Sequence, residues 1–463
     1  MTNTRQIGLA CLIVCCCVSA LWGLFLQQSS RDGMLDFKGA YYAARSVIHH
    51  RDPYKIGEPL RVCQSEGGDC MQPSDVLTQV LSLNVYFLTV FIFTAPFALL
   101  PWGPVHLLWT IFSAGILCLA AFLIWDFTRD YSPVASLVLI CFLLANCEAI
   151  FGTGNIAGIA VSLCVVAVSC FLHERYVPAG IFCLALSLVI KPHDAGLVWL
   201  YLLLTGGVYR KRALQTLALT VALGLPSVLW VTNIAPNWIQ ELHSNLLTDS
   251  APGGAVDPGP STANSGSGPS VNISLQSTLA LVWNDRRIYD PATYLLCGAL
   301  FLVWVMTILR SRLSQTSAWI AFGSIVPLTM LVTYHRPYDA KLLLLAIPAF
   351  AMVWAERGLT GWFAAIVTTA ALASTADIPL TLLLIINQYL YMSTAGLFRR
   401  ILSAVLQRPT PLILVAMVSF YLWVYLRRTV SERGTAFREA QEGQSATFAF
   451  GERHGNSNQC REP

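Results

Sequence analysis

Residue types suited to chemistry are concentrated in a polar stretch, residues 27–82, that follows the first long apolar run. This stretch holds thirteen charged residues in a chain that is only 12% charged. Asp36 lies shortly beyond the apolar run, where an ionised carboxylate can accept a proton from an attacking hydroxyl. The alternative is that Asp36 only caps its own helix. Tyr41, Tyr42 and Arg45 follow on the same predicted helix and are candidate substrate contacts.

A second polar cluster, Lys191-Pro192-His193-Asp194, has apolar sequence on both sides. Ionisable residues in such a place are costly unless they have a function or a partner. Lys191 could neutralise a phosphate as a point charge, and His193 beside it is a candidate substrate contact. Equally, Lys191 could pair with Asp194 or extend to the membrane interface, and the sequence leaves both interpretations open.

A third cluster, residues 334–341, reads Tyr-His-Arg-Pro-Tyr-Asp-Ala-Lys and separates two apolar runs. So many titratable side chains in one turn exceed what solvation of a loop requires. His335 and Arg336 can clamp a phosphate through charge-assisted hydrogen bonds. Tyr338 and Asp339 are candidate substrate contacts. The sequence favours a functional site here over a simple loop.

Weaker signals come from a short turn and from the cysteines. Asn155 ends the small-residue turn 152–155, which is more often only a tight turn, and it is a candidate substrate contact. Cys63 and Cys70 stand together in the polar stretch, and both a disulfide and two free thiols are open. No metal-protease, redox or nucleotide-binding motif is present, so no metal ligand and no cofactor is predicted, although a divalent metal is not excluded.

Composition defines the fold class. The chain is 55% hydrophobic with a mean hydropathy of +0.60, and its apolar runs repeatedly reach the ~20 residues that cross a bilayer. We therefore expect an all-α polytopic transmembrane protein of about 11–13 spans, in contact with membrane lipids, with interfacial helices in its first external loop. The net charge of only +4 is scattered, so no nucleic-acid partner is expected.

Basic residues in short loops predict the orientation of the chain. The run 7–26 is expected to be a retained first span with its N-terminus in the cytoplasm. The basic cluster 210–212 is then cytoplasmic, which places the polar stretches 27–82 and 232–290 outside. Residues 178–208 form either one span kinked at Pro192 or two short segments with an outer turn, and the second is favoured.

The C-terminal part of the chain is less well defined by its charges. Residues 1–430 are expected to form one membrane domain, and 431–463 a polar, disordered tail. Orientation near the last apolar run stays open, because basic residues stand on both sides of it: Arg399, Arg400, Arg408, Arg427 and Arg428.

In order along the chain, the segments DFKGAYYAARSVIHHRDPY, NVYFLTVFIFTAPFALLPWG, GTGN, AGIFCLALSLVIKPH and YHRPYDAKLLLLAIP resemble glycosyltransferase family 87 of the integral-membrane GT-C superfamily. This resemblance covers about residues 5–355. One departure is Asn84-Val85-Tyr86, which stands where the family has an aromatic-Pro-Pro signature.

The resemblance implies an inverting hexosyltransferase that takes its sugar, with mannose favoured, from a polyprenyl-phosphate donor and passes it to a lipid or glycan acceptor. It implies Asp36 as the catalytic base and Lys191, His335 and Arg336 as ligands of the donor phosphate. It also implies a bacterial inner membrane, with the active site on the periplasmic or external face.

A transporter or flippase without catalysis is the competing interpretation. It would use Lys191, Asp194, Asp339 and Lys341 as a coupling site and would be expected to show two similar halves. The sequence contains no such internal repeat, and a long polar loop with an acid is an unusual feature for a transporter.

Overall fold

The computed structural model describes residues 2–30, 33–259, 272–311, 314–389 and 396–431, and within these ranges every regular element is helical. By length and composition, seven of the described helices can cross a membrane. They are α1 (Thr2–Ser29), α6 (Trp102–Thr128), Pro133–Thr153, α12 (Gly207–Ile234), α15 (Arg286–Arg310), α16 (Gln315–Val332) and Thr410–Ser431. The all-α polytopic class is confirmed, whereas the larger expected number of spans also counted shorter apolar helices.

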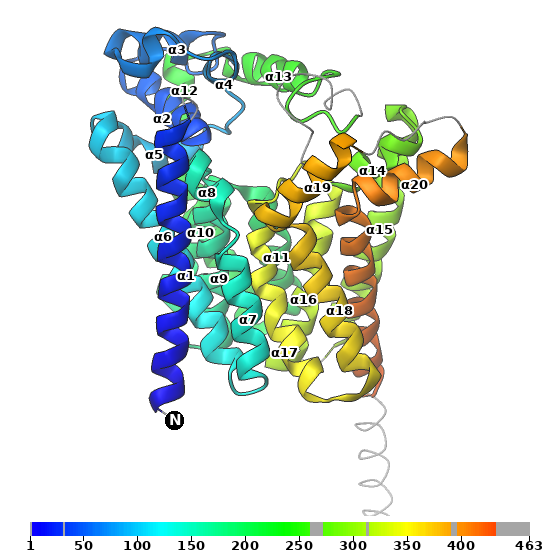
Figure 1. Ribbon diagram of the computed structural model, residues 1–463. Helices are drawn as coiled ribbons and strands as arrows, with labels where there is room; N and C mark the ends of the chain where they lie inside the picture. Colours follow the sequence, from blue (N-terminus) through cyan, green and yellow to red (C-terminus); the bar gives the residue numbers. More distant parts are fainter. Residues whose placement is uncertain (1, 31–32, 260–271, 312–313, 390–395, 432–463) are drawn as a thin grey trace, which may run out of the picture.

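Short helices form a cap over one end of the bundle, and the N-terminus lies at the other end (Figure 1). The cap contains α2 (Leu35–Ile48), α3 (Glu58–Glu66), α4 (Asp75–Ser82) and α13 (Trp238–Asp249). Its helix α2 is packed against α5 (Val90–Ala98), a nine-residue apolar helix that is too short to span a bilayer. The apolar residues 83–100 therefore support the cap and do not form a span of their own.

Three short helices form the middle of the bundle: α9 (Ala157–Leu172), α10 (Val177–Ile190) and α11 (Pro192–Thr205). Almost all of α9 is buried, which explains why its sequence is apolar on every face. The chain breaks at Lys191 between α10 and α11, because Pro192 begins the new helix at its first position. The two-segment interpretation of 178–208 agrees with this break.

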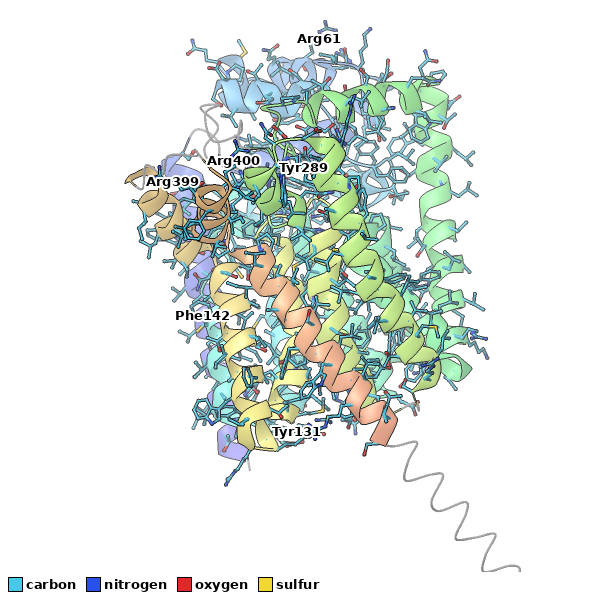
Figure 2. The ribbon with its side chains drawn as sticks, turned by 90° about the vertical axis from the view of Figure 1, so that its right-hand side faces the viewer. Arg61, Tyr131, Phe142, Tyr289, Arg399 and Arg400 are labelled. Carbon is cyan, nitrogen blue, oxygen red and sulfur yellow. A yellow bond between two sulfur atoms is a disulfide. The ribbon has the colours of Figure 1, made fainter. Side chains whose placement is uncertain are left out.

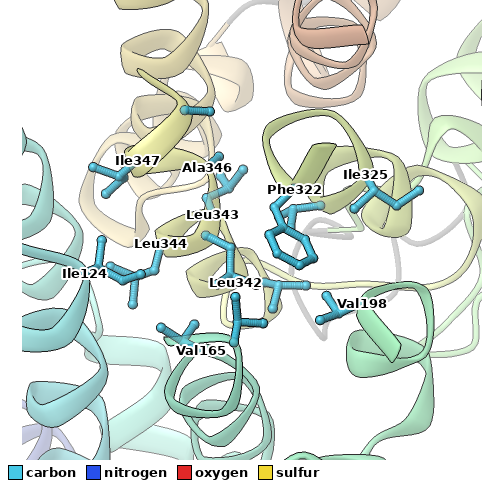
Figure 3. Close-up of a cluster of buried hydrophobic side chains, with 14 of the residues drawn as sticks. Ile124, Val165, Val198, Phe322, Ile325, Leu342, Leu343, Leu344, Ala346 and Ile347 are labelled. Atoms are coloured by element: carbon cyan, nitrogen blue, oxygen red, sulfur yellow. The ribbon is translucent and has the colours of Figure 1, made fainter. Parts of the chain in front are cut away.

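The core is filled by an apolar segment that the sequence marks as part of a span, η3 (Asp339–Ala346) followed by α17 (Ile347–Ala355). Figure 3 shows Leu342, Leu343 and Leu344 among side chains from α6, α9, α11 and α16. All eight residues of η3 are buried inside protein. Its polar first turn is thereby buried as well.

The remaining helices are α7 (Pro133–Leu144), α8 (Glu148–Thr153), α14 (Leu275–Val282), α18 (Gly358–Ser374), α19 (Asp377–Tyr389), α20 (Leu397–Gln407) and the 3-10 turn η1 (Gly68–Met71). A bend of 71° separates α19 from α18, so these two apolar helices do not form one straight span. In Figure 2, Arg399 and Arg400 lie toward the cap and Tyr131 lies at the other end.

The final helix connects the two ends of the bundle. Arg408 precedes it and donates hydrogen bonds to carbonyls of the second polar stretch, whereas Arg428 near its end pairs with Glu356 in the turn between α17 and α18. That turn lies at the end away from the cap (Figure 1). The basic residues around the last run are thus divided between the two ends.

Candidate active site

Asp36 stands in the first turn of α2, next to the turn that ends α8. Met34, with φ of 59°, precedes the helix, and its backbone N–H donates to the carbonyl of Gly152 (2.8 Å). The half-buried carboxylate of Asp36 accepts a hydrogen bond from the side-chain amide of Asn155 (2.8 Å). The backbone carbonyl of Asp36 accepts one from the hydroxyl of Tyr86 (2.9 Å). The first polar stretch is therefore attached to the bundle at Asp36.

Asn155 is itself rigidly placed. Its amide oxygen accepts from the backbone N–H of Ala157 at the start of α9 (2.8 Å), which leaves the NH₂ group to face Asp36. The preceding Gly154 ends α8 with φ of 67°, and its carbonyl accepts from the indole N–H of Trp109 (2.9 Å). The turn therefore holds the amide of Asn155 against the carboxylate of Asp36. Its role is thus more specific than that of a simple tight turn.

A second group of buried charges meets where the α10–α11 turn contacts the start of η3. The ammonium of Lys191 contacts the carboxylate of Asp339 and lies 3.7 Å from Asp194 Oδ2. His335 Nε2 lies 3.2 Å from Asp194 Oδ1, and the ring centroids of His193 and His335 are 5.0 Å apart. The sequence clusters at 191–194 and 334–341 thus form one constellation.

The loop before η3 is held by its own backbone. The backbone N–H of Arg336 donates to Asp339 Oδ2 (2.8 Å), and its guanidinium donates to the carbonyl of Ala255 (3.2 Å) and lies over the ring of Tyr334. The ring of Tyr338 faces the ammonium of Lys191 at 5.2 Å. These contacts order two cations and two phenols around one turn.

Electrostatic coupling relates this constellation to Asp36. Burial opposes the charged form of Arg336, but the neighbouring Tyr334 and Tyr338 and the carboxylates of Asp36 and Asp249 raise the pKa of its guanidinium above the ordinary value. Burial, opposed by the charge of Arg336 and assisted by that of Asp36, raises the pKa of Tyr334 to about 12. The charges of Asp36 and Arg336 therefore act on each other.

The other predicted substrate contacts have packing partners. Tyr41 is fully buried and donates to the carbonyl of Leu100 (2.7 Å), while Tyr42 stacks on Trp102. Arg45 donates to the carbonyl of Ala98 (2.7 Å). These contacts attach α2 to α5 and α6, and a role of these three residues in substrate contact stays a prediction.

Arg45 also pairs with Glu66 of α3, next to the cysteines of the cap. Cys63 and Cys70 are joined by a disulfide in the structure, with their Cα atoms 5.6 Å apart. The disulfide closes the segment between α3 and η1 at the outer face of the cap.

Tyr86 and Asp194 are the residues that sequence reasoning did not select for the site. Tyr86 is positioned by Asn84, whose side-chain oxygen accepts from its backbone N–H (3.1 Å), and by its own bond to Asp36. Only the departure from the aromatic-Pro-Pro signature drew attention to this turn. The sequence presents Asp194 as a partner for Lys191 and as part of the coupling site of a transporter, but nothing in the sequence shows that it meets His335.

One family model, described as glycosyltransferase family 87, matches residues 84–334. The match begins after the first polar stretch and ends at Tyr334, so it includes Asn155, Lys191 and His193, whereas Asp36 lies before it. Comparison with curated proteins and comparison with solved structures each return no match.

Proposed function

Since this chain belongs to glycosyltransferase family 87, we propose that it is an inverting membrane hexosyltransferase that uses a polyprenyl-phosphate sugar, mannose first, as donor. The acceptor is a lipid or a glycan. The observation that supports this proposal best is that Asp36 is held by Asn155 and that its charge helps to raise the pKa of the Arg336 guanidinium.

Asp36 is the proposed catalytic base. As the acceptor hydroxyl attacks the anomeric carbon, its proton passes to the carboxylate. One carboxylate and one displacement give inversion at that carbon, because no covalent glycosyl intermediate forms. Asn155 keeps the carboxylate in place through a hydrogen bond.

The leaving group of this reaction is a lipid phosphate, which gains negative charge as the glycosidic bond breaks. Arg336 and Lys191 are proposed to stabilise that charge, since preorganised cations in a site of low polarity act strongly on charge that develops during the reaction. His335 is fully buried, so its proposed action on the phosphate is exerted from behind these two residues. His193, Asn155, Tyr338 and Asp339 are proposed to line the sugar and acceptor space.

We place this chemistry on the external, periplasmic face of a bacterial inner membrane. Arg210 and Lys211 begin α12, and α12 leads from there to α13 of the cap (Figure 1). Because basic residues in short loops favour the cytoplasm, the cap and Asp36 are outside. A donor with its lipid tail among the spans would present its sugar at this level.

The test compares Asp36→Asn with wild type and with Asp75→Asn, a matched control at an exposed acid of the same polar stretch. Membranes are supplied with radiolabelled polyprenyl-phosphate mannose and then with other polyprenyl-phosphate sugars, and transfer of the label is measured. Loss of a base of this kind lowers transfer by about 10²–10⁴-fold, so Asp36→Asn loses detectable transfer at equal protein level while Asp75→Asn retains it. Equal transfer in all three proteins removes Asp36 as base, and no transfer with any donor favours the transporter.

A further inference from the structure

We propose that His193, Asp194 and His335 form a binding site for one divalent transition-metal ion, for which Zn²⁺ is the natural probe. One donor atom from each residue lies within 4.8 Å of the others. Two imidazoles and a carboxylate are ligands that Zn²⁺ commonly takes in proteins. The three residues come from the first turn of α11 and from the loop before η3, so the site forms only in the folded chain.

The separations of the donor atoms fit coordination. His335 Nε2 lies 3.2 Å and His193 Nε2 lies 3.9 Å from Asp194 Oδ1. With metal–ligand bonds of about 2.0–2.1 Å, two ligands of a tetrahedral ion stand about 3.3 Å apart. A small rotation of the His193 side chain is therefore enough to bring all three atoms onto one ion. His193 has the most room of the three for such a rotation, since its side chain is 40% exposed and the other two are 1% exposed.

The unsatisfied buried atoms point to a missing cation. Both carboxylate oxygens of Asp194 and Nε2 of His335 have no hydrogen-bond partner among the described residues, although both side chains are only 1% exposed. Buried polar atoms are normally satisfied, and an exception requires an explanation such as a bound ion. Here Asp194 Oδ1 and His335 Nε2 face each other at 3.2 Å, while Oδ2 has the ammonium of Lys191 at 3.7 Å.

The second ring nitrogen of His335 is bound as in a metal-ligating histidine. Its Nδ1 lies 3.1 Å from the backbone carbonyl of Thr333, which can accept a hydrogen from it, and 3.3 Å from the hydroxyl of the same residue. When the hydrogen is on Nδ1, Nε2 presents its lone pair to Asp194 Oδ1 at 3.2 Å, and a cation bound between these two atoms would be a partner for both. An imidazole that donates its other N–H to a backbone carbonyl is the usual arrangement of a metal-ligating histidine.

Nearby charges permit a divalent ion. Lys191 approaches the other carboxylate oxygen, Oδ2, so it does not occupy the position between Oδ1 and the rings. The charge of Lys191 is offset by Asp339, which it contacts directly. With neutral histidines, the two carboxylates and one ammonium sum to −2 + 1 = −1, which a divalent ion changes to +1. A buried cluster with net positive charge suits an anionic ligand.

Three protein ligands leave a coordination position open, which is the pattern of catalytic rather than structural zinc sites. Access is on the side of His193, the one exposed ligand. The role of the ion rests on the proposed function, since the open position would take a phosphate oxygen of the donor and polarise it as a Lewis acid. This arrangement also explains how the fully buried His335 acts on the phosphate.

The experiment measures metal binding without any substrate. Purified full-length protein in detergent is treated with EDTA, desalted, mixed with Zn²⁺ and desalted again, and bound zinc is counted by mass spectrometry. Wild type and His243→Ala, a control at an exposed histidine of α13, are expected to retain about one zinc per chain more than His193→Ala. The difference between variants is the readout, because the many cysteines can also hold zinc but do so equally in all three proteins.

Asp194→Asn serves as the second variant, with size-exclusion chromatography to show that it is folded, and it is also expected to lose one zinc. Equal zinc in wild type and His193→Ala would overturn the site, as would wild type that retains none. Protein without zinc that transfers sugar refutes the role of the ion in transfer and leaves the proposed function standing. Protein that binds zinc but transfers no sugar leaves the metal site standing and refutes the proposed function.

Discussion

Asn155 is the residue on which the geometry of Asp36 most depends. One side of its amide is held by the backbone of α9 and the other by the carboxylate, so it transmits the position of the bundle to the acid of the cap. Asn155 lines the proposed acceptor space but acts on the proton transfer only through its hydrogen bond to Asp36, so for this step it is a positioning residue. Its removal leaves the base present but free to rotate.

Asn155→Ala is therefore expected to lower kcat about 10–100-fold, the equivalent of a hydrogen bond to a charged group worth about 1.5–3 kcal/mol. KM for the donor changes little, because the phosphate ligands are untouched. Steady-state transfer assays with purified protein check both parameters. Thr153→Ala is the matched control, since its hydroxyl bonds only the carbonyl of Ala149 in the same turn. A fall confined to KM would contradict a positioning role.

Local elements explain which parts of this site the sequence could predict. The clusters at 191–194 and 334–341 were recognisable because charged residues interrupt apolar runs, and the break at Lys191 followed from Pro192. That His335 would meet Asp194 was not recognisable, because the two are far apart in sequence and only the packing of η3 brings them together. Segment η3 leads into the second of the two apolar runs that residues 334–341 separate, and apolar periodicity does not distinguish its burial in protein from contact with lipid.

The turn that ends α8 makes a prediction at the scale of an element. Gly154 has φ of 67°, and a Cβ there would lie 2.7 Å from the Cβ of Phe37 and 2.8 Å from the sulfur of Met34. Gly154→Ala is expected to destabilise the protein by about 1–3 kcal/mol, because it combines a left-handed backbone with a steric conflict. The conflict also separates α2 from the turn, so transfer is expected to fall with stability.

Gly152→Ala is the control for this substitution. Its Cβ would lie 3.8 Å from Leu26, an ordinary contact, and its backbone is helical. Thermal unfolding in detergent, followed by the loss of monodisperse protein on size-exclusion chromatography, ranks the two variants. Equal stability of both would mean that the approach of α2 to this turn is not a constraint on the fold.

At the scale of the whole molecule, the bundle separates two ends with different chemistry. The cap end contains Asp36, the buried charged constellation and the Cys63–Cys70 disulfide, while the other end contains the basic start of α12. Composition predicted the membrane class and the two external polar stretches. It left the C-terminal orientation open, because counting basic residues does not show which of them lie beyond the bend after α18.

The division between the two ends predicts the topology of the C-terminus. The last described helix, Thr410–Ser431, ends beside the turn of Glu356 and therefore at the same end as the N-terminus. With Arg210 and Lys211 cytoplasmic, this end is inside. Green fluorescent protein fused after Pro463 is expected to fluoresce, and alkaline phosphatase fused there to be inactive, since the phosphatase folds only in an oxidising compartment. Alkaline phosphatase fused after Gly67, within the cap, is expected to be active. The opposite pattern at both fusion points would invert the molecule and place Asp36 on the cytoplasmic side, and phosphatase activity at both points would mean that the final helix does not cross.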